Sequence, residues 1–498
     1  MAERPGRTLM LQGTSSSVGK SYLAAGICRL YARRGLRVAP FKAQNMALNA
    51  AVTSGGAEIG RAQAVQAEAA GVPAEPAMNP ILLKAEQDHS SQVVLLGEVF
   101  GRLSAVEYRH ARAELWPHVE AALTDLRSRF DLVVIEGAGS PAEVNLREGE
   151  IVNMRVAEAA EAPVVLVGDI DRGGVFAALL GTLDLLPPAD RARVHGLIVN
   201  RFRGDARLFA DGVRFLEERS RLPVLGVVPH LDDVQLPAED SLDLGLLRGG
   251  LGPHVLDVAI LGLERISNFD ELQPLAAEPG VGVRVVTHAA DLGTPDLLVL
   301  PGSKMTAQDL DGLRAQGLAD RVVAARERGA AVLGICGGYQ MLGRTIHDPG
   351  GVERAGTFPG LALLPTVTRF EDRKTTVQRR ATVTPAPGLF ERAAGLAVAG
   401  YEIHMGETTG ADPGVLDVEG RPEGCRSEDG WVVGTGLHGL LLDGALRRAL
   451  LEAVAARQGR ELPPPGPPRP DPFDRIADAL TAALDVPRLD RIAGVAGC

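Results

Sequence analysis

The stretch Gly13-Thr-Ser-Ser-Ser-Val-Gly-Lys-Ser21 decides the architecture of the first half of the chain. It follows the short apolar run Thr8–Leu11 and precedes a helical pattern over residues 22–34. A strand, a glycine-framed loop and a helix in this order hold phosphate groups, because the loop N–H groups and the helix N-terminus are electropositive. Lys20 adds a point charge, and the Ser21 hydroxyl can bind Mg²⁺. The stretch therefore predicts an ATP-binding loop.

The spacing of this loop differs from that of the standard P-loop. Five residues, rather than the usual four, separate Gly13 from Gly19. A loop of this length resembles that of the dethiobiotin synthetase group, which phosphorylates carboxylates. The resemblance implies a P-loop-like domain with a parallel sheet. The residues expected to bind ATP are Gly13, Thr14, Gly19, Lys20, Ser21 and, at a later strand end, Asn200, whose amide can pair with the adenine edge.

Apolar runs alternate with helical stretches from residue 8 to about residue 230. Five further runs are apolar enough for strands that are buried on both faces, namely 36–39, 131–135, 162–167, 194–199 and 223–228. Alternation with helices predicts a parallel sheet, in which ligands lie beyond the carboxyl ends of the strands. Polar residues follow the runs at that end: Lys42, Gln44, Asn45, Glu136, Asp169 and Asn200.

The overall composition limits the kinds of partner. At 498 residues the chain is too long to fold around a single hydrophobic core, so two or three domains are expected. A net charge of −11 and an aromatic content of 4% argue against nucleic acid. No apolar segment is long enough to span a membrane, and Met1–Gly13 carries no leader-like run. The four cysteines are scattered without a paired motif, which is typical of the reducing cytoplasm.

A change of composition divides the chain into two halves. The acidic stretch 230–240 and the breaker cluster 248–253 predict a domain linker, and a second α/β alternation begins at Val255. More β-type and turn signals occupy 355–435. The expected organisation is one α/β domain at 1–240, a second at 254–455, and a Pro-rich joint with an amphipathic helix near 473–484 in the segment 456–498.

The stretch Val332-Leu-Gly-Ile-Cys336-Gly-Gly-Tyr-Gln-Met-Leu-Gly343 is the second strong signal. An apolar run ends at Ile335, a cysteine occupies the turn, and Gly337-Gly338 opens a helical pattern. This is the arrangement of a nucleophile elbow, in which small neighbours permit a sharp turn. A helix N-terminus stabilises a thiolate and offers N–H groups to an oxyanion. Cys336 is therefore the predicted nucleophile.

A histidine is expected to act as base and acid for this cysteine. His438 comes just after the short β-type run that begins at Val433, and it is the preferred partner of Cys336, with His404 as the rival. Gly302 follows a strand in Val299-Leu-Pro-Gly302. Gly302 and Gly337 are the expected oxyanion-hole donors.

The second half of the chain resembles class I glutamine amidotransferases, in which a cysteine elbow and a later histidine hydrolyse glutamine to release ammonia. The whole chain, from Gly13 to about Leu450, resembles the cobyric acid synthases of the cobalamin pathway. One of the long matching stretches is Ala39-Pro-Phe-Lys-Ala-Gln-Asn-Met-Ala-Leu-Asn49. The others follow in the same order, at 60–63, 78–84, 136–143, 169–176, 200–205, 265–269, 334–343 and 401–406.

This resemblance implies an ATP-dependent amidoligase at 1–240 and a glutamine amidotransferase at 254–455. The implied reaction amidates four carboxylates (b, d, e and g) of adenosylcobyrinic acid a,c-diamide. ATP with Mg²⁺ would phosphorylate each carboxylate, and ammonia from glutamine would displace the phosphate. The expected partners are glutamine and a corrinoid small molecule, with no nucleic acid and no membrane, in the cytoplasm. Assembly into a homo-oligomer is left open.

Roles in the synthetase site follow from residue chemistry and position. Lys20 is expected to hold the β- and γ-phosphates. Ser21 and Glu136 are expected to bind Mg²⁺, because hard cations prefer oxygen ligands. Glu58 or Asp169 would complete the ligand set.

Three further residues are assigned to phosphoryl transfer and substrate. Lys42 lies at a strand end, where it could meet the transferred phosphoryl group. Gln44 and Asn45 follow it closely and are expected to contact substrate.

The sequence departs from the family patterns at three positions. Leu440 stands two residues after His438, where the broad amidotransferase pattern has Glu; the cobyric branch shares this feature, which leaves the group that orients His438 unassigned. Ser17 replaces an expected aspartate in the phosphate loop, so no acidic role is assigned there. Met305 stands where the family usually has Asn.

Three alternative functions are weighed against this one. A sister amidoligase, such as cobyrinate a,c-diamide synthase, would share both domains, and only the resemblance of 41–49 argues against it. A partitioning-type switch ATPase would use ATP for dimerisation, but it has no use for Cys336 and His438. A pseudo-glutaminase scaffold is disfavoured by the intact Cys/His pair.

Overall fold

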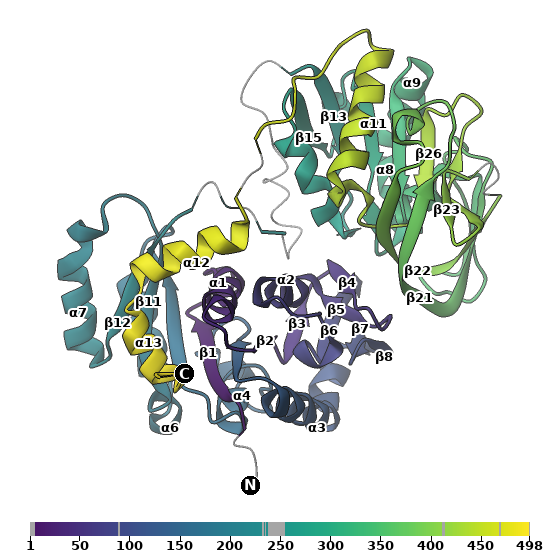
Figure 1. Ribbon diagram of the computed structural model, residues 1–498. Helices are drawn as coiled ribbons and strands as arrows, with labels where there is room; N and C mark the ends of the chain where they lie inside the picture. Colours follow the sequence, from purple (N-terminus) through teal and green to yellow (C-terminus); the bar gives the residue numbers. More distant parts are fainter. Residues whose placement is uncertain are drawn as a thin grey trace. The chain divides into compact units, whose positions relative to one another are not determined.

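The computed structural model describes residues 5–87, 90–231, 234, 236–237, 254–410, 414–467 and 470–497. The chain forms two compact units (Figure 1). The first comprises Met1–Ala47, Ala57–Leu236 and Pro468–Cys498, and the second comprises Leu48–Gly56 and Pro237–Pro467. The linker expected at 230–254 falls mostly outside the described residues.

A six-stranded parallel sheet forms the centre of the first unit, in the order β12-β11-β10-β1-β9-β2. Apart from Arg7, the residues of β1, β2, β9 and β10 are buried, as expected for strands covered on both faces. The prediction of a parallel α/β sheet is confirmed, and all six apolar runs are strands. These strands are β1 (Arg7–Gly13), β2 (Val38–Phe41), β9 (Leu132–Glu136), β10 (Val164–Asp169), β11 (Val194–Phe202) and β12 (Val224–Pro229).

Helices connect these strands, and the first of them begins directly after the phosphate loop. Gly19 precedes α1 with φ 93°, a left-handed conformation that glycine adopts at little steric cost. Among the described helices, none has both the length and the apolar composition needed to cross a bilayer. The helices between β1 and β12 are α1 (Lys20–Arg33), α2 (Arg61–Ala70), α3 (Ala105–Arg129), α4 (Met154–Ala159), α5 (Val175–Leu185), α6 (Pro188–Arg191) and α7 (Ala210–Ser220).

A smaller four-stranded sheet, in the order β3-β6-β7-β8, extends the first unit and was not predicted. Its strands are short or mixed in polarity; β8, for example, is almost entirely exposed or half-buried and contains Gly101. Such strands lack the continuous apolar run by which the central strands were recognised. The elements of this region are β3 (Gln44–Met46), β5 (Glu58–Gly60), β6 (Ile81–Gln87), β7 (Ser90–Leu95) and β8 (Glu98–Ser104).

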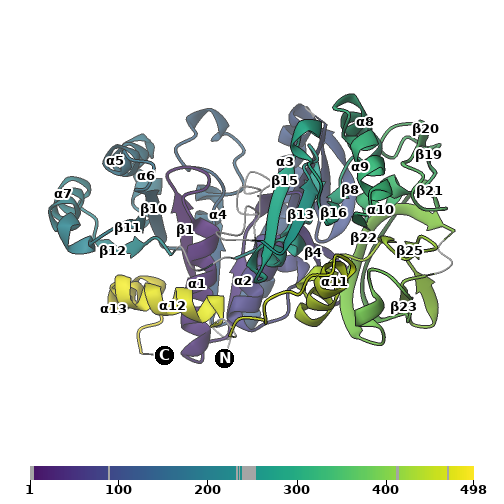
Figure 2. The ribbon, with the colours of Figure 1, turned by 90° about the horizontal axis from the view of Figure 1, so that it is seen from above.

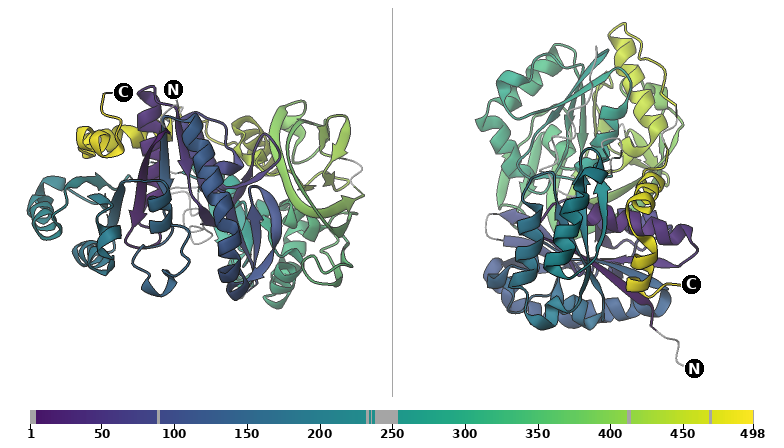
Figure 3. Two further views of the ribbon diagram at one scale, coloured as in Figure 1. Left: turned by 90° about the horizontal axis from the view of Figure 1, so that it is seen from below. Right: turned by 90° about the vertical axis from the view of Figure 1, so that its left-hand side faces the viewer.

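The C-terminal helices α12 (Pro472–Ala483) and α13 (Val486–Ala493) belong to the first unit. The helix predicted near 473–484 is confirmed, but the segment 456–498 is not a separate tail. Ile476 and Leu480 are completely buried in the core cluster that also contains α1, and Arg29 Nε donates to Asp474 Oδ1 at 2.7 Å. The apolar face of α12 thus requires α1 as its cover (Figure 1, Figure 2 and Figure 3).

The second unit repeats the α/β plan, as the second alternation predicted. Its sheet has the order β15-β13-β16-β18-β26-β25, and all pairs are parallel except β25 with β26. The strands are β13 (Leu256–Leu261), β15 (Val281–Val286), β16 (Leu297–Leu300), β18 (Ala331–Ile335), β25 (Cys425–Arg426) and β26 (Val432–Thr435). The helices are α8 (Thr306–Ala315), α9 (Leu318–Glu327), α10 (Gly337–Leu342) and α11 (Gly444–Arg457).

A second, largely antiparallel sheet occupies the region 345–423. This confirms the prediction of β-structure that was based on the β-type and turn signals of 355–435. The long hairpin of β21 (Val367–Val383) and β22 (Ala397–Thr409) dominates it and carries His404. The remaining strands are β19 (Thr345–Asp348), β20 (Gly356–Pro359), β23 (Leu416–Val418) and β24 (Arg421–Glu423).

One short excursion of the chain was not predicted. Residues Leu48–Gly56, which include β4 (Ala50–Val52), belong to the second unit, although the chain on both sides of them belongs to the first. The expected first domain, 1–240, therefore has an interruption of nine residues. Hydrogen bonds to residues of the second unit, described below, account for this assignment.

Candidate active sites

Cys336 occupies a sharp turn between β18 and α10. Its backbone has φ 49° and ψ −108°, a conformation that non-glycine residues rarely adopt and that surrounding structure must hold. The Cys336 N–H donates to the Thr435 carbonyl oxygen at 2.8 Å. A Cβ placed on Gly338 would lie 2.0 Å from the Leu300 carbonyl oxygen, so α10 approaches β16 as closely as only glycine allows. The turn has the geometry expected of a nucleophile elbow.

His438 and Glu271 form a buried pair beside this cysteine. The 3-10 helix η5 (Phe269–Ala277) carries Glu271, whose Oε1 lies 2.6 Å from His438 Nδ1. Glu271 Oε2 accepts the Gly439 N–H at 2.8 Å. His438 is 0% exposed and Glu271 2% exposed. The carboxylate therefore fixes both the imidazole and the backbone that follows it.

The second ring nitrogen of His438, Nε2, is available for interaction with Cys336. Within the described residues, His438 Nε2 has no hydrogen-bond partner. Burial on its own would lower the pKa of His438, but the neighbouring Cys336 and Glu271 raise it to about 10. The histidine is thus held in the form that can accompany a thiolate and later donate a proton.

His404 lies on β22 and lines the same cavity as Cys336. The Cys336 Sγ atom is 4.0 Å from the carbonyl oxygen of the preceding residue, Ile403. His404 Nδ1 is 3.1 Å from the Gly406 carbonyl oxygen, and burial is the main cause of the lowered pKa of His404. Of the two candidate histidines, His438 is the one with a carboxylate on Nδ1.

Gly302 and Gly337 come together near the same point. Gly302 begins β17 (Gly302–Ser303), which pairs antiparallel with β14 (Ile266–Ser267). A Cβ on Gly302 would lie 2.9 Å from His438 Cε1, and a Cβ on Gly337 would lie 2.7 Å from the Ser303 nitrogen. The structure therefore brings both predicted oxyanion-hole glycines to the cysteine and histidine, while their hydrogen bonds to an oxyanion stay a prediction.

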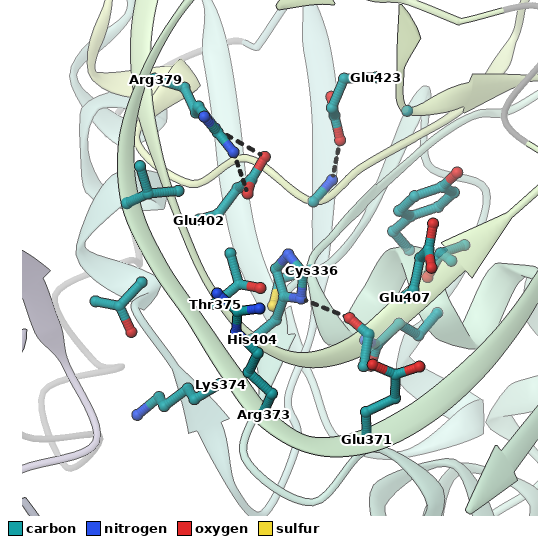
Figure 4. Close-up of a pocket in the computed structure, with 18 of the residues that line it drawn as sticks. Cys336, Glu371, Arg373, Lys374, Thr375, Arg379, Glu402, His404, Glu407 and Glu423 are labelled. Atoms are coloured by element: carbon teal, nitrogen blue, oxygen red, sulfur yellow. Dashed lines mark hydrogen bonds and ion pairs between the residues drawn. The ribbon is translucent and has the colours of Figure 1, made fainter. Parts of the chain in front are cut away.

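A cavity of about 640 Å³ opens over Cys336, and charged side chains line much of it (Figure 4). Arg379 donates to Glu402 at 3.4 Å and 3.5 Å. Glu423 Oε1 accepts the Gly436 N–H at 2.6 Å, and burial raises the pKa of Glu423 to about 7. Charges of both signs suit a ligand that carries an ammonium and a carboxylate. The other charged residues of the lining are Glu371, Arg373, Lys374 and Glu407, and His404 lines the cavity as well.

The phosphate loop of the first unit closes around Lys20. The Lys20 ammonium donates to the carbonyl oxygens of Ser15 at 3.0 Å and Gly139 at 3.1 Å, and the residue is 6% exposed. The Thr14 N–H donates to the Val167 carbonyl oxygen at 2.9 Å, which ties the loop to β10. A Cβ on Gly13 would lie 2.8 Å from the Lys20 Nζ atom. The loop therefore encloses the cation that was predicted for it.

Glu136, at the end of β9, accepts hydrogen bonds from polar residues that were expected at the edge of the sheet. Its Oε1 accepts from Ser21 Oγ at 2.8 Å and from Lys42 Nζ at 2.9 Å. Its Oε2 accepts from Gln66 Nε2 at 2.6 Å. Glu136 is 1% and Lys42 7% exposed. The structure brings Ser21, Lys42 and Glu136 together and adds Gln66, which was not predicted.

The remaining candidates of the first unit have other contacts. Glu58 pairs with Lys84 at 2.6 Å, and Asp169 pairs with Arg201 at 2.9 Å, so each of these carboxylates is engaged by a cation. Within the described residues there is no cluster of three His, Cys, Asp or Glu suited to a metal. One carboxylate beside one hydroxyl, as in Glu136 and Ser21, is still a suitable pair for Mg²⁺, because this ion takes most of its ligands from phosphates and water.

Three predicted binding residues have defined partners. Gln44 Oε1 accepts from the Tyr108 hydroxyl at 2.5 Å, and Asn45 Nδ2 donates to Gln63 Oε1 at 2.9 Å. Asn200 Nδ2 donates to the Val18 carbonyl oxygen at 2.8 Å and so braces the phosphate loop. Contact of Asn200 with adenine, and of Gln44 and Asn45 with substrate, stay predictions.

Comparison with known proteins bears on both units. A model described as the CobQ/CobB/MinD/ParA nucleotide binding domain matches residues 9–243, and one described as the CobB/CobQ-like glutamine amidotransferase domain matches residues 257–446. A curated cobyric acid synthase of Sorangium cellulosum (strain So ce56) is 50% identical over 517 residues, covering 98% of this chain and 99% of that protein. The chain belongs to the cobyric acid synthase family.

Other members of the family agree with this assignment. The cobyric acid synthases of Dehalococcoides mccartyi (strain CBDB1) and Geobacillus thermodenitrificans (strain NG80-2) are each 46% identical and cover 97% of this chain, with 98% and 97% of their own lengths matched. As a member of the cobyric acid synthase family with a matching amidotransferase domain, the chain is a glutamine-dependent amidating ligase of cobalamin biosynthesis.

Sequence reasoning missed two residues of these sites. Glu271 comes two residues after the matching stretch 265–269, and only this position hinted at it. Gln66 is a polar residue in a helix whose other buried residues are mostly small and apolar. A buried polar residue in such a pattern is a usable signal, since it must find a hydrogen-bond partner.

Proposed function

We propose that the chain converts adenosylcobyrinic acid a,c-diamide to adenosylcobyric acid by amidating carboxylates b, d, e and g with ATP and glutamine. The amidoligase occupies the first unit and the glutamine amidotransferase the second. The observation that carries the proposal is the presence of two complete polar centres in one chain. One is the Lys20 loop with Glu136 and Lys42, and the other is Cys336 with His438 and Glu271.

The second unit supplies ammonia. The Cys336 thiolate attacks the carboxamide carbon of glutamine, and backbone N–H groups at Gly302 and Gly337 stabilise the oxyanion. His438, held as an imidazolium by Glu271, gives its proton to the departing ammonia. It then takes a proton from the water that hydrolyses the thioester, which releases glutamate and restores the thiolate.

Glutamine is recognised in the charged cavity over Cys336. Its α-carboxylate requires a cation and its α-ammonium requires an anion, and the lining offers both kinds of group. Arg379 and Glu402 already form such a pair at the wall.

The first unit activates the carboxylate. An oxygen of the substrate carboxylate attacks the γ-phosphorus of ATP, ADP leaves, and a carboxyl phosphate results. Lys20 neutralises the β- and γ-phosphates, and Lys42 neutralises the transferred group. Asn200 is assigned to adenine, and Gln44 and Asn45 are assigned to substrate.

Ser21 and Glu136 would hold Mg²⁺, which supplies further charge neutralisation on the phosphates when bound. Ammonia then attacks the acyl carbon of the carboxyl phosphate, and inorganic phosphate leaves with one of the original carboxylate oxygens. The result is one amide for each ATP and each glutamine consumed.

Two finer statements complete the proposal. A cytoplasmic location is proposed because the described cysteines Cys28, Cys336 and Cys425 form no disulfide with one another. The absence of a nucleic-acid partner rests on the net charge of −11, and a homo-oligomer stays open.

The test is mass spectrometry of the corrinoid after incubation with ATP, Mg²⁺ and glutamine. The a,c-diamide should gain four amides, whereas cobyrinic acid, in which carboxylates a and c are free, should be a poor substrate at those two positions. Amidation confined to positions a and c would assign the chain to the sister amidoligase, cobyrinate a,c-diamide synthase. No amidation of either acid would refute both functions.

A further inference from the structure

The excursion Leu48–Gly56 reaches the surroundings of the glutaminase base. Its residues Asn49 and Ala50 are both 0% exposed, so they are part of the interior of the second unit. They directly follow the stretch that contains Lys42 and Asn45 in the chain. Nine residues between two segments of the synthetase unit thus contribute to the core of the amidotransferase unit.

The first set of contacts fixes the beginning of η5, the element that carries Glu271. The Ala50 N–H donates to Asn268 Oδ1 at 2.9 Å, and the Phe269 N–H donates to Asn49 Oδ1 at 3.3 Å. Asn268 has φ 52°, a left-handed conformation that asparagine tolerates better than most residues. The two bonds hold this turn from both sides, two residues before Glu271.

The second contact reaches His438 through Tyr401. The Tyr401 hydroxyl donates to the Ala50 carbonyl oxygen at 3.4 Å. The Tyr401 ring stacks on the imidazole of His438, with ring centroids 5.4 Å apart and an interplanar angle of 20°. The backbones of the two residues also exchange hydrogen bonds of 3.0 Å and 2.8 Å. Ala50 therefore touches both elements that hold the histidine.

We propose that Leu48–Gly56 is a positioning segment of the glutaminase, with Asn49 and Ala50 holding Glu271 and Tyr401 against His438. This inference rests on the proposed glutaminase and adds residues that do not touch glutamine. Its consequence is that the geometry of the catalytic base depends on a part of the chain that continues directly from Lys42. If the segment contributed only to packing, changing it would lower the stability of the fold without a specific effect on the rate of glutamine hydrolysis.

The test compares Asn49→Ala and Tyr401→Phe with the wild-type full-length chain. Glutamine hydrolysis is measured without ATP or corrinoid, and kcat should fall about tenfold in each variant, the effect of losing one hydrogen bond of ordinary strength. KM for glutamine should stay within about twofold, because neither residue lines the glutamine cavity. Amidation with high ammonia should match the wild type.

A second readout follows the catalytic pair itself. The rate at which iodoacetamide alkylates Cys336 is measured across neutral pH. When Glu271 is held less firmly, it stabilises the His438 imidazolium less, so the rise in alkylation should move to higher pH. A merely structural role would lower activity through unfolded protein and would leave this profile in place.

Gln378→Ala is the matched control. Gln378 is exposed, and its Nε2 donates to the Val52 carbonyl oxygen at 2.8 Å, so it anchors the same segment through Val52 rather than through Asn49 or Ala50. It lies opposite Tyr401 in the pairing of β21 with β22, so the variant also tests a change beside Tyr401 that leaves the Tyr401 hydroxyl in place. This variant should hydrolyse glutamine at the wild-type rate. Equal losses in Gln378→Ala and Asn49→Ala would overturn the proposal.

Wild-type kcat and an unchanged alkylation profile in Asn49→Ala and Tyr401→Phe would also overturn it. If Asn49→Ala fails to fold, Tyr401→Phe decides, since it removes one oxygen and keeps the stacked ring. A wild-type chain that does not hydrolyse glutamine would refute the proposed glutaminase, and the alkylation profile would still test the segment.

Discussion

Glu271 Oε1 lies 2.6 Å from His438 Nδ1, although 167 positions separate the two residues in the chain. The broad amidotransferase pattern places the glutamate two residues after the histidine, where this chain has the buried Leu440. A carboxylate from η5 therefore occupies the position at the imidazole that the adjacent glutamate would otherwise take. We infer that the orienting group has been supplied from a different element without loss of the histidine geometry.

The first prediction concerns this carboxylate. Glu271→Gln should lower kcat for glutamine hydrolysis by roughly 10²- to 10⁴-fold, because the amide orients the imidazole but does not stabilise its charged form. The raised pKa of His438 should fall, so alkylation of Cys336 at neutral pH should slow and recover only at higher pH.

Glu278→Gln serves as its control. Glu278 directly follows the same element and pairs with Arg447 at 2.7 Å, so its neutralisation tests a change of charge away from His438. Equal kinetics in Glu271→Gln and Glu278→Gln would contradict the assignment of Glu271.

The second prediction separates the two histidines. His438→Ala should behave like Cys336→Ala, with glutamine-dependent amidation lost and ammonia-dependent amidation kept. His404→Ala should retain most glutamine hydrolysis at saturating glutamine, since His404 lies at the cavity wall and its Nδ1 faces a backbone carbonyl. Steady-state assays with each nitrogen source check this, and the reverse pattern would transfer the role to His404.

Much of the fold could be read from the sequence because its strands are unusual. A strand buried on both faces is a nearly continuous apolar run, as in the first four residues of β9, Leu132 to Ile135. Such a run between two helical patterns is rarely anything but a buried strand. The strands of β3-β6-β7-β8 are short or mixed in polarity, so the sequence carries no comparable signal for them. The helix α12 was readable as a helix, but its cover by α1 depends on a contact across more than 440 positions.

The sites divide in the same way. Lys20, Ser21 and Cys336 sit in loops whose local geometry needs glycines at fixed spacing, so the sequence shows them directly. Glu271 and Asn49 act on His438 only after distant elements come together, and spacing along the chain carries no trace of that. Both residues can be recognised because they are polar and buried, and burial is known only once the chain has folded.

The third prediction concerns the phosphate loop. Lys20→Ala should abolish amidation with either nitrogen source, since removing a cation from the phosphates typically costs several kcal/mol of transition-state stabilisation. Glutamine hydrolysis by Cys336 should survive at least in part, because that chemistry uses no phosphate. Arg33→Ala, at the exposed far end of α1, should be active in both assays. Near-normal amidation by Lys20→Ala with ammonia would show that this loop does not hold ATP.

The fourth prediction concerns stability and pH. Asp309 is 4% exposed, and burial raises its pKa from 3.8 to about 6 although Ser303 Oγ donates to it at 2.6 Å. A folded-state pKa above the unfolded value gives a stabilising contribution that is complete below about pH 3.8 and is lost as the pH rises through about 6. Asp309→Asn removes this titration and keeps an acceptor for Ser303.

The measurement for Asp309 is the free energy of unfolding by urea at several pH values. The advantage of Asp309→Asn over the wild type should grow as the pH rises from 4 to 6.5 and then level off. Parallel curves for the two proteins across this range would be inconsistent with a buried, protonated Asp309.

The central claim is that one chain activates a corrinoid carboxylate with ATP and then converts it to an amide with nitrogen from glutamine. The most direct test uses the a,c-diamide with ¹⁸O in its free carboxylates, together with ATP, Mg²⁺ and [amide-¹⁵N]glutamine. Mass spectrometry of both products should find ¹⁵N in each new amide and one ¹⁸O atom in the inorganic phosphate for every amide formed. Amides formed with unlabelled phosphate would contradict activation through a carboxyl phosphate.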